Sequence, residues 1–167
     1  MCHTPAISTK GVSEMQVFRG AVVHTGEAVL EGADVVVDGG RIHSVGAAAP
    51  SGAEVIDLTG RHLCPGFVDA HVHMGVMPVG FANESKDLNE MTSPLTPHLR
   101  AVDAVWPGDA AFAHARAAGV TTVCVLPGSA NVISGQGVVL KTVGRNVEKM
   151  ALREPACLKV AFGYNVK

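Results

Sequence analysis

The chain has 167 residues, enough for one domain with a hydrophobic core or for a small domain and part of another. It is close to neutral, with 13 basic and 15 acidic residues, and no stretch is dense in Lys and Arg. This charge pattern, together with a single Trp and a single Tyr, argues against a nucleic-acid-binding surface.

The sequence also argues against a membrane partner. Residues 1–15 are polar and lack the apolar core of a signal peptide. No apolar run approaches the ~20 residues that a membrane-spanning helix needs. The four cysteines form no C-x-x-C pair, so we expect reduced thiols in a cytoplasmic protein: Cys2, Cys64, Cys124 and Cys157.

Residues 16–64 carry the pattern of short strands without a helix. Strand-like runs cover 16–23, 33–37, 41–45, 54–58 and 61–64. Asp38-Gly39-Gly40 joins two of these runs and is typical of a hairpin, so we predict an antiparallel arrangement. The region also contains His24, His43 and His62, which share no ligand spacing and are interpreted as surface or packing residues.

The most informative stretch is Pro65-Gly66-Phe67-Val68-Asp69-Ala70-His71-Val72-His73. It predicts one buried strand, begun by Pro-Gly, that ends in two histidines. Residues two apart on a strand point to the same face, so the aspartate and both histidines project to one side. Two imidazoles on one rigid strand can hold a metal ion, and the aspartate can orient or join them. The alternative is a pair of structural histidines.

The next segment, residues 74–97, is long and irregular, and it is either a substrate-facing loop or a solvated insertion. A helix is then predicted over 97–105 and a second over 110–118, with Asp109 as its N-cap and Gly119 after its end. Residues 120–126 read as a fully buried strand of a parallel sheet. The turn that follows contains Ser129 and Asn131, which either contact a substrate or complete a plain turn.

The last part of the chain continues the alternation of strand and helix. Strands are predicted over 137–143 and 156–163, with a helix over 145–153 that ends at Glu154-Pro155. Lys159 interrupts the last, otherwise apolar strand, on the same face as Cys157 and Ala161. A lysine in such a strand either serves a functional site or reaches a strand end with its ammonium group.

The run PGFVDAHVH, together with the Gly-Val-Thr-Thr-Val strand at 119–123, resembles the amidohydrolase superfamily, and within it imidazolonepropionase-like and prolidase-like members. The resemblance implies an α/β fold: the N-terminal part of a (β/α)8 TIM barrel with about four β/α units over residues 65–167, preceded by a small antiparallel β-sandwich portion over residues 1–64. Because a complete barrel needs ~250 residues, only the N-terminal portion of such an enzyme is expected here.

What the resemblance implies chemically is a divalent metal, expected to be Zn²⁺ as one or two ions, with His71 and His73 as ligands. Lys159 corresponds to a lysine that many members carry in carboxylated form as a metal bridge. The implied reaction is hydrolysis of a C–N bond in an amide or cyclic amide by a metal-activated water. The family's later histidines and its catalytic aspartate have no counterpart in this chain.

Three interpretations follow. The first is an enzyme fragment that is inactive alone and needs a complementary C-terminal half or self-association, because a half barrel leaves open strand edges. The second is a non-catalytic remnant or subunit. The third is a small metal-binding protein, for which the sequence offers no third and fourth ligand beyond Asp69 or Lys159.

Overall fold

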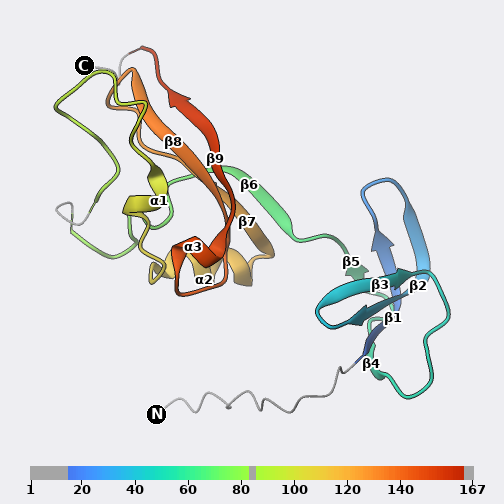
Figure 1. Cartoon of the computed structure of the whole chain (residues 1–167). Helices are drawn as coiled ribbons and strands as arrows, with labels where there is room; N and C mark the ends of the chain where they lie inside the picture. The colour runs from blue at the N-terminus through green and yellow to red at the C-terminus, as the bar shows by residue number, and fades with distance from the viewer. Residues whose placement is uncertain (1–14, 83–85, 164–167) are drawn as a thin grey trace, which may run out of the picture. The chain divides into compact units, whose positions relative to one another are not determined.

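The computed structural model describes residues 15–82 and 86–163, and Figure 1 shows the course of the chain. The chain divides into two compact units, Met1–Pro65 and Gly66–Lys167. Each unit is described by itself.

The described residues of the first unit form a single five-stranded sheet, so they do not by themselves form the two layers of the expected β-sandwich. They contain no helix, as predicted. The strands are β1 (Gln16–His24), β2 (Val29–Asp38), β3 (Arg41–Val45), β4 (Glu54–Asp57) and β5 (His62–Leu63). They lie in the order β3-β2-β1-β4, and β5 also pairs with β1. The prediction of five strand-like runs is confirmed.

The pairing directions differ in part from the prediction. β1, β2 and β3 form the expected antiparallel meander, and Gly39 and Gly40 take positive φ values of 54° and 76° in its hairpin turn. β4 and β5, however, both run parallel to β1. The chain crosses from β3 to the far side of β1 before β4 begins, and strands reached by such a crossover need not alternate in direction.

The second unit contains a four-stranded mixed sheet and three short helices. The strands are β6 (Phe67–Val72), β7 (Val120–Val125), β8 (Ile133–Lys141) and β9 (Ala151–Val160), in the order β6-β7-β8-β9. The helices are α1 (Ala101–Ala104), α2 (Ala110–Ala117) and α3 (Val147–Met150). None of the helices in the described residues is long and apolar enough to cross a membrane.

The expected four successive β/α units are not formed. β6 and β7 are parallel, but β8 is antiparallel to both β7 and β9. The connection lengths explain the difference. Parallel neighbours need a crossover of a dozen or more residues, which residues 73–119 supply between β6 and β7. Residues 126–132 and 142–150 are too few for a crossover, so the chain returns beside the strand that it has just left.

Two predicted helices are shorter than expected because their ends pair with β8. Of the helix predicted over 97–105 only α1 forms, since Arg100 forms a bridge with Gln136 and the amide of Gln136 donates to Leu99 O at 2.7 Å. The helix predicted over 145–153 contracts to α3, because residues from Ala151 onward join the β9 ladder. The prediction for α2, with its Asp109 cap, is confirmed.

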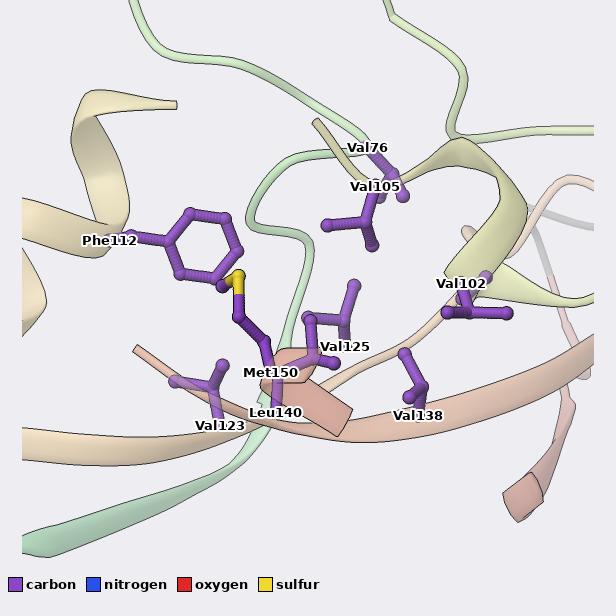
Figure 2. Close-up of a cluster of buried hydrophobic side chains, with 10 residues drawn as sticks. Val76, Val102, Val105, Phe112, Val123, Val125, Val138, Leu140 and Met150 are labelled. Carbon is purple, nitrogen blue, oxygen red and sulfur yellow. The ribbon is translucent and has the colours of Figure 1, made fainter. Parts of the chain in front are cut away.

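The core of the second unit lies between one face of the sheet and the helices (Figure 2). β7 and β8 contribute alternate side chains that are at most 1% exposed, namely Val123, Val125, Val138 and Leu140. The helices and the segment after β6 cover them with Val76, Val102, Val105, Phe112 and Met150. Strand alternation therefore leaves the opposite face of β7 and β8 outside this core.

β6 is not the buried strand that its apolar residues predict. Phe67 is 58% exposed and Val68 is 67% exposed, whereas Val72 packs against the core. β6 is an edge strand paired only with β7, so most of its length lacks a second neighbour among the described residues.

The buried carboxylate of Asp109 joins α2 to the segment that follows the histidines. It accepts hydrogen bonds from the amides of Gly75 at 2.9 Å, Val79 at 3.1 Å and Ala111 at 3.0 Å. Gly75 lies two residues after His73 and has a φ of +78°, and a Cβ there would meet Val105 and Trp106. The chain leaves β6 in a fixed direction for this reason.

We predict that Asp109→Ala destabilises the second unit by about 2–4 kcal/mol, because it removes the α2 cap and leaves the Gly75 amide without its partner in the interior. Urea denaturation measures the change. Asp103→Ala is the matched control, since Asp103 is an exposed helix carboxylate in a surface ion pair with Arg100 and should cost less than about 1 kcal/mol. Equal losses in the two variants would contradict the assigned role.

Candidate metal centre

Three strands of the second unit have their carboxyl-terminal ends at the same end of the sheet. β6 and β7 are parallel, and β9 runs in their direction because two antiparallel steps separate it from β7. His71 and His73 lie at and just after the end of β6, and Lys159 is the penultimate residue of β9. His71 and Lys159, which are 88 positions apart in the chain, thus meet at this end of the sheet.

His73 is held by a carbonyl group of the neighbouring strand's end. Its Nδ1 lies 2.8 Å from Leu126 O, which can only accept a hydrogen bond. Nδ1 must therefore carry the proton, and in the neutral ring Nε2 keeps its lone pair. A backbone carbonyl that fixes the tautomer in this way is the usual partner of a metal-ligating histidine.

His71 faces the predicted lysine. Lys159 Nζ lies 3.4 Å from His71 Nε2, and because an ammonium group only donates, this nitrogen also presents its lone pair. The rings of His71 and His73 are in T-shaped contact with centroids 5.4 Å apart. Partial desolvation and the charges of Lys159 and His73 lower the pKa of His71, which favours the neutral form that binds metals.

Asp69 orients the backbone rather than an imidazole ring. Its Oδ1 accepts a hydrogen bond from the amide of His71 at 3.1 Å, and its charge opposes the lowering of the His71 pKa. Within the described residues no three His, Cys, Asp or Glu side chains gather around one point, so Asp69 does not complete a ligand set with the two histidines.

Two thiols lie on the sheet face that Lys159 shares. Cys157 is two residues before Lys159 on β9, and its thiol lies near enough to that of Cys124 on β7 to influence the pKa of Cys124. Gly137 on β8 leaves room for the Cys157 thiol, since an added Cβ would lie 2.9 Å from Cys157 Sγ. Burial and the neighbouring Cys157 raise the pKa of Cys124 to about 11.

The donor set fits a borderline divalent cation. Two imidazoles that each present an unprotonated Nε2 are ligands that zinc accepts, and the adjacent lysine, which donates to His71 Nε2, can contribute an oxygen ligand only after carboxylation. The two histidines and Lys159 are the described residues that would hold such an ion. As they stand they offer fewer ligands than the three protein side chains of a typical catalytic zinc site.

Other predicted contacts lie elsewhere. Asn131 is buried and its Nδ2 donates to Ser93 O at 3.2 Å and to Thr96 Oγ1 at 2.7 Å, so it ties the turn after β7 to residues 93–96. A cavity of about 250 Å³ lies between residues 87–90 and α1, and neither histidine of the pair nor Lys159 lines it. The irregular course of residues 74–97 is confirmed in its described part, and its role toward a substrate stays a prediction.

Sequence reasoning missed the carbonyl of Leu126 and the thiol pair. The Leu126 carbonyl carries no residue-type signal, since any residue at the end of β7 would present one. The approach of Cys124 to Cys157 depends on the antiparallel return of β8 and on Gly137. The glycine in a strand was visible in the sequence as a site of close approach.

Comparisons with known proteins show the family to which the chain belongs. No family model matches the chain. An amidohydrolase named tasK from Hapsidospora irregularis is 35% identical over 150 residues, which are 80% of this chain and 15% of tasK. An adenine deaminase of Methanopyrus kandleri is 39% identical over 83 residues, or 48% of this chain and 14% of the deaminase.

The crystal structure of an amidohydrolase from Thermotoga maritima MSB8 superimposes with a TM-score of 0.84 at 43% identity, over 90% of this chain and 39% of that one. The protein is thus built like the part of an amidohydrolase that it matches. It belongs to the amidohydrolase superfamily and corresponds to an N-terminal portion of its members. The chain spans less than half the length of these relatives.

We predict that the thiol of Cys124 reacts with iodoacetamide far more slowly than that of exposed Cys64 at pH 8. With a pKa of about 11, only about one Cys124 in a thousand is ionised at that pH, and the thiolate is the reactive form. Peptide mass spectrometry of a labelling time course measures each rate. A Cys124 rate equal to that of Cys64 would contradict the thiol packing described here.

Proposed function

We propose that the protein of which this chain forms part is a metal-dependent amidohydrolase that hydrolyses a C–N bond of an amide or cyclic amide with an activated water. The observation that carries the proposal is the meeting of His71, His73 and Lys159 at one strand edge in a chain of this superfamily. Zn²⁺ is the proposed ion. N-acyl amino acids, dipeptides and lactam-type rings are the substrate classes to screen.

The two histidines would supply nitrogen ligands whose orientation is fixed by their neighbours. His73 donates from Nδ1 to Leu126 O and so keeps Nε2 for the ion, while the β6 backbone and Asp69 hold His71. When bound, the cation supplies Lewis acidity and a water that is a nucleophile at neutral pH. The chain's own contribution is a rigid ligand pair, because both imidazoles project from one strand end.

Lys159 is proposed to act as a carbamate. The ammonium group first loses a proton to water; the neutral amine then adds to the carbon of CO2 and loses a second proton to water, which leaves an anionic oxygen ligand. As an ammonium group, the same side chain would repel a cation bound beside His71, so metal binding and carboxylation favour each other. The partial burial of Lys159 and its 3.4 Å approach to His71 support this role.

We further propose that a working centre needs ligands from outside the described residues, supplied by a complementary C-terminal half or by self-association. Two histidines and one lysine leave positions of the ion open, and the described residues offer no third His, Cys, Asp or Glu. The second candidate function, a non-catalytic remnant or subunit, is distinguished by the hydrolysis experiment below. A small metal-binding protein would instead show a closed site in this chain alone.

We predict that the chain binds Zn²⁺ through the histidine pair. His71→Asn and His73→Asn should each weaken binding at least tenfold, because each removes one of two nitrogen ligands. Isothermal titration calorimetry in the presence of bicarbonate measures the affinity. His114→Asn on α2 is the matched control, since His114 is an exposed histidine outside the strand that carries the pair. Unchanged affinity in both site variants would remove the proposed centre.

We predict that a chimera gains hydrolase activity when this chain is joined to the part of the Thermotoga maritima amidohydrolase that follows the matched region. The chain alone should be inactive in the same amide and lactam screen. In the chimera, His71→Asn should abolish turnover and Lys159→Arg, which keeps the charge but forms no carbamate, should reduce it at least a hundredfold. A folded, zinc-loaded chimera without activity would favour the non-catalytic interpretation.

A further inference from the structure

The first unit contains a second histidine pair, which the sequence did not reveal. His24 ends β1 and His62 begins β5, and the two strands pair in parallel with Val22 opposite His62. His24 Nε2 lies 2.9 Å from His62 Nδ1, and the ring centroids are 5.1 Å apart. The two residues are 38 positions apart in the chain, so no spacing rule could link them.

The pair lies on the sheet face opposite the buried cluster of Ala21, Val23 and Val35. Val23, which follows Val22 on β1, is only 5% exposed and points into the core of the unit with Ala21. Strand alternation places His24 on the opposite face, and His62 is exposed beside it. Within the part of the chain that the structure describes, neither ring forms a salt bridge with a carboxylate, and the two imidazoles are hydrogen-bonded to each other.

The nitrogen separation has a chemical consequence. One ring must donate and the other accept, so a single proton lies between two nitrogens that both become ligands once that proton moves. Metal–imidazole bonds are about 2.0–2.1 Å long, so two nitrogens in cis positions at a right angle lie about 2.9 Å apart, and at a tetrahedral angle about 3.4 Å apart. The observed 2.9 Å is that of an N–H···N hydrogen bond, and it equals the right-angle separation, so the two rings need only turn until both lone pairs point to one ion.

We propose that His24 and His62 form a surface binding site for a divalent transition metal with right-angle coordination, of the Ni²⁺ or Cu²⁺ class. On binding, the proton between the rings leaves the donor nitrogen, and the other nitrogen of the same ring takes one up from water, so both rings stay neutral. Water fills the remaining positions. Square-planar and octahedral ions favour such nitrogen pairs, and Zn²⁺ in tetrahedral geometry fits them less well.

Ni²⁺ is the probe, since thiols do not reduce it. The chain used carries His71→Asn and His73→Asn to remove the proposed centre. It also carries His3→Asn, because His3 next to Cys2 near the amino terminus offers competing donors. Calorimetric titration should give one Ni²⁺ per chain, bound at least fivefold more tightly than Zn²⁺. This experiment does not depend on the amidohydrolase proposal.

Adding His24→Asn or His62→Asn should weaken Ni²⁺ binding at least tenfold, whereas His43→Asn should leave it unchanged, since His43 is an exposed histidine on β3 of the same sheet. Equal affinity in all three variants, or equal losses, would overturn the site. A second measurement needs no substitution: in the native chain, Ni²⁺ should shift the imidazole proton signals of both paired histidines together. A shift of only one of them would also overturn the proposal.

Discussion

The carboxylate of Asp109 is the interaction on which the second unit depends. It accepts hydrogen bonds from backbone amides of the segment after β6 and of the first turn of α2, and so connects the edge strand β6 to the helices. β6 has little core of its own, since only its last residue, Val72, packs inward. The position of the end of β6 that carries the histidines therefore depends on hydrogen bonds. His73 donates to Leu126 O, the amide of Leu126 donates to Val72 O, and Asp109 accepts from the segment that follows.

The proposed ligands His71 and His73 are well oriented even without an ion. His73 has one tautomer because its partner is a carbonyl, and His71 presents a lone pair because its partner is an ammonium group. These roles follow from the chemistry of the partners and need no bound ion. The face that carries them also holds the neighbouring thiols of Cys124 and Cys157 and lies opposite the core formed by β7 and β8. The chain thus presents the pair on a surface where further ligands can be added.

Local patterns predicted the elements well, but not how some of them pair. The hairpin at Gly39-Gly40, the α2 cap and the strand before His73 follow from neighbouring residues, and all three are formed. The antiparallel return of β8 was missed because the resemblance implied parallel units, although the short connection over residues 126–132 already disfavoured a crossover. The shortened helices could not be predicted, since their ends are taken up by pairing with β8, a contact between segments distant in sequence.

The two histidine pairs mark the boundary between what a sequence reveals and what only a fold reveals. His71 and His73 lie two apart on one strand, so alternation alone puts them on one face. His24 and His62 come together only because β5 pairs in parallel with β1, which the predicted antiparallel arrangement would not have indicated. Their chemistry differs for the same reason. Partners outside the first pair fix its tautomers and leave both Nε2 atoms unprotonated, whereas the two rings of the second pair are hydrogen-bonded to each other and bind a cation only after the shared proton leaves.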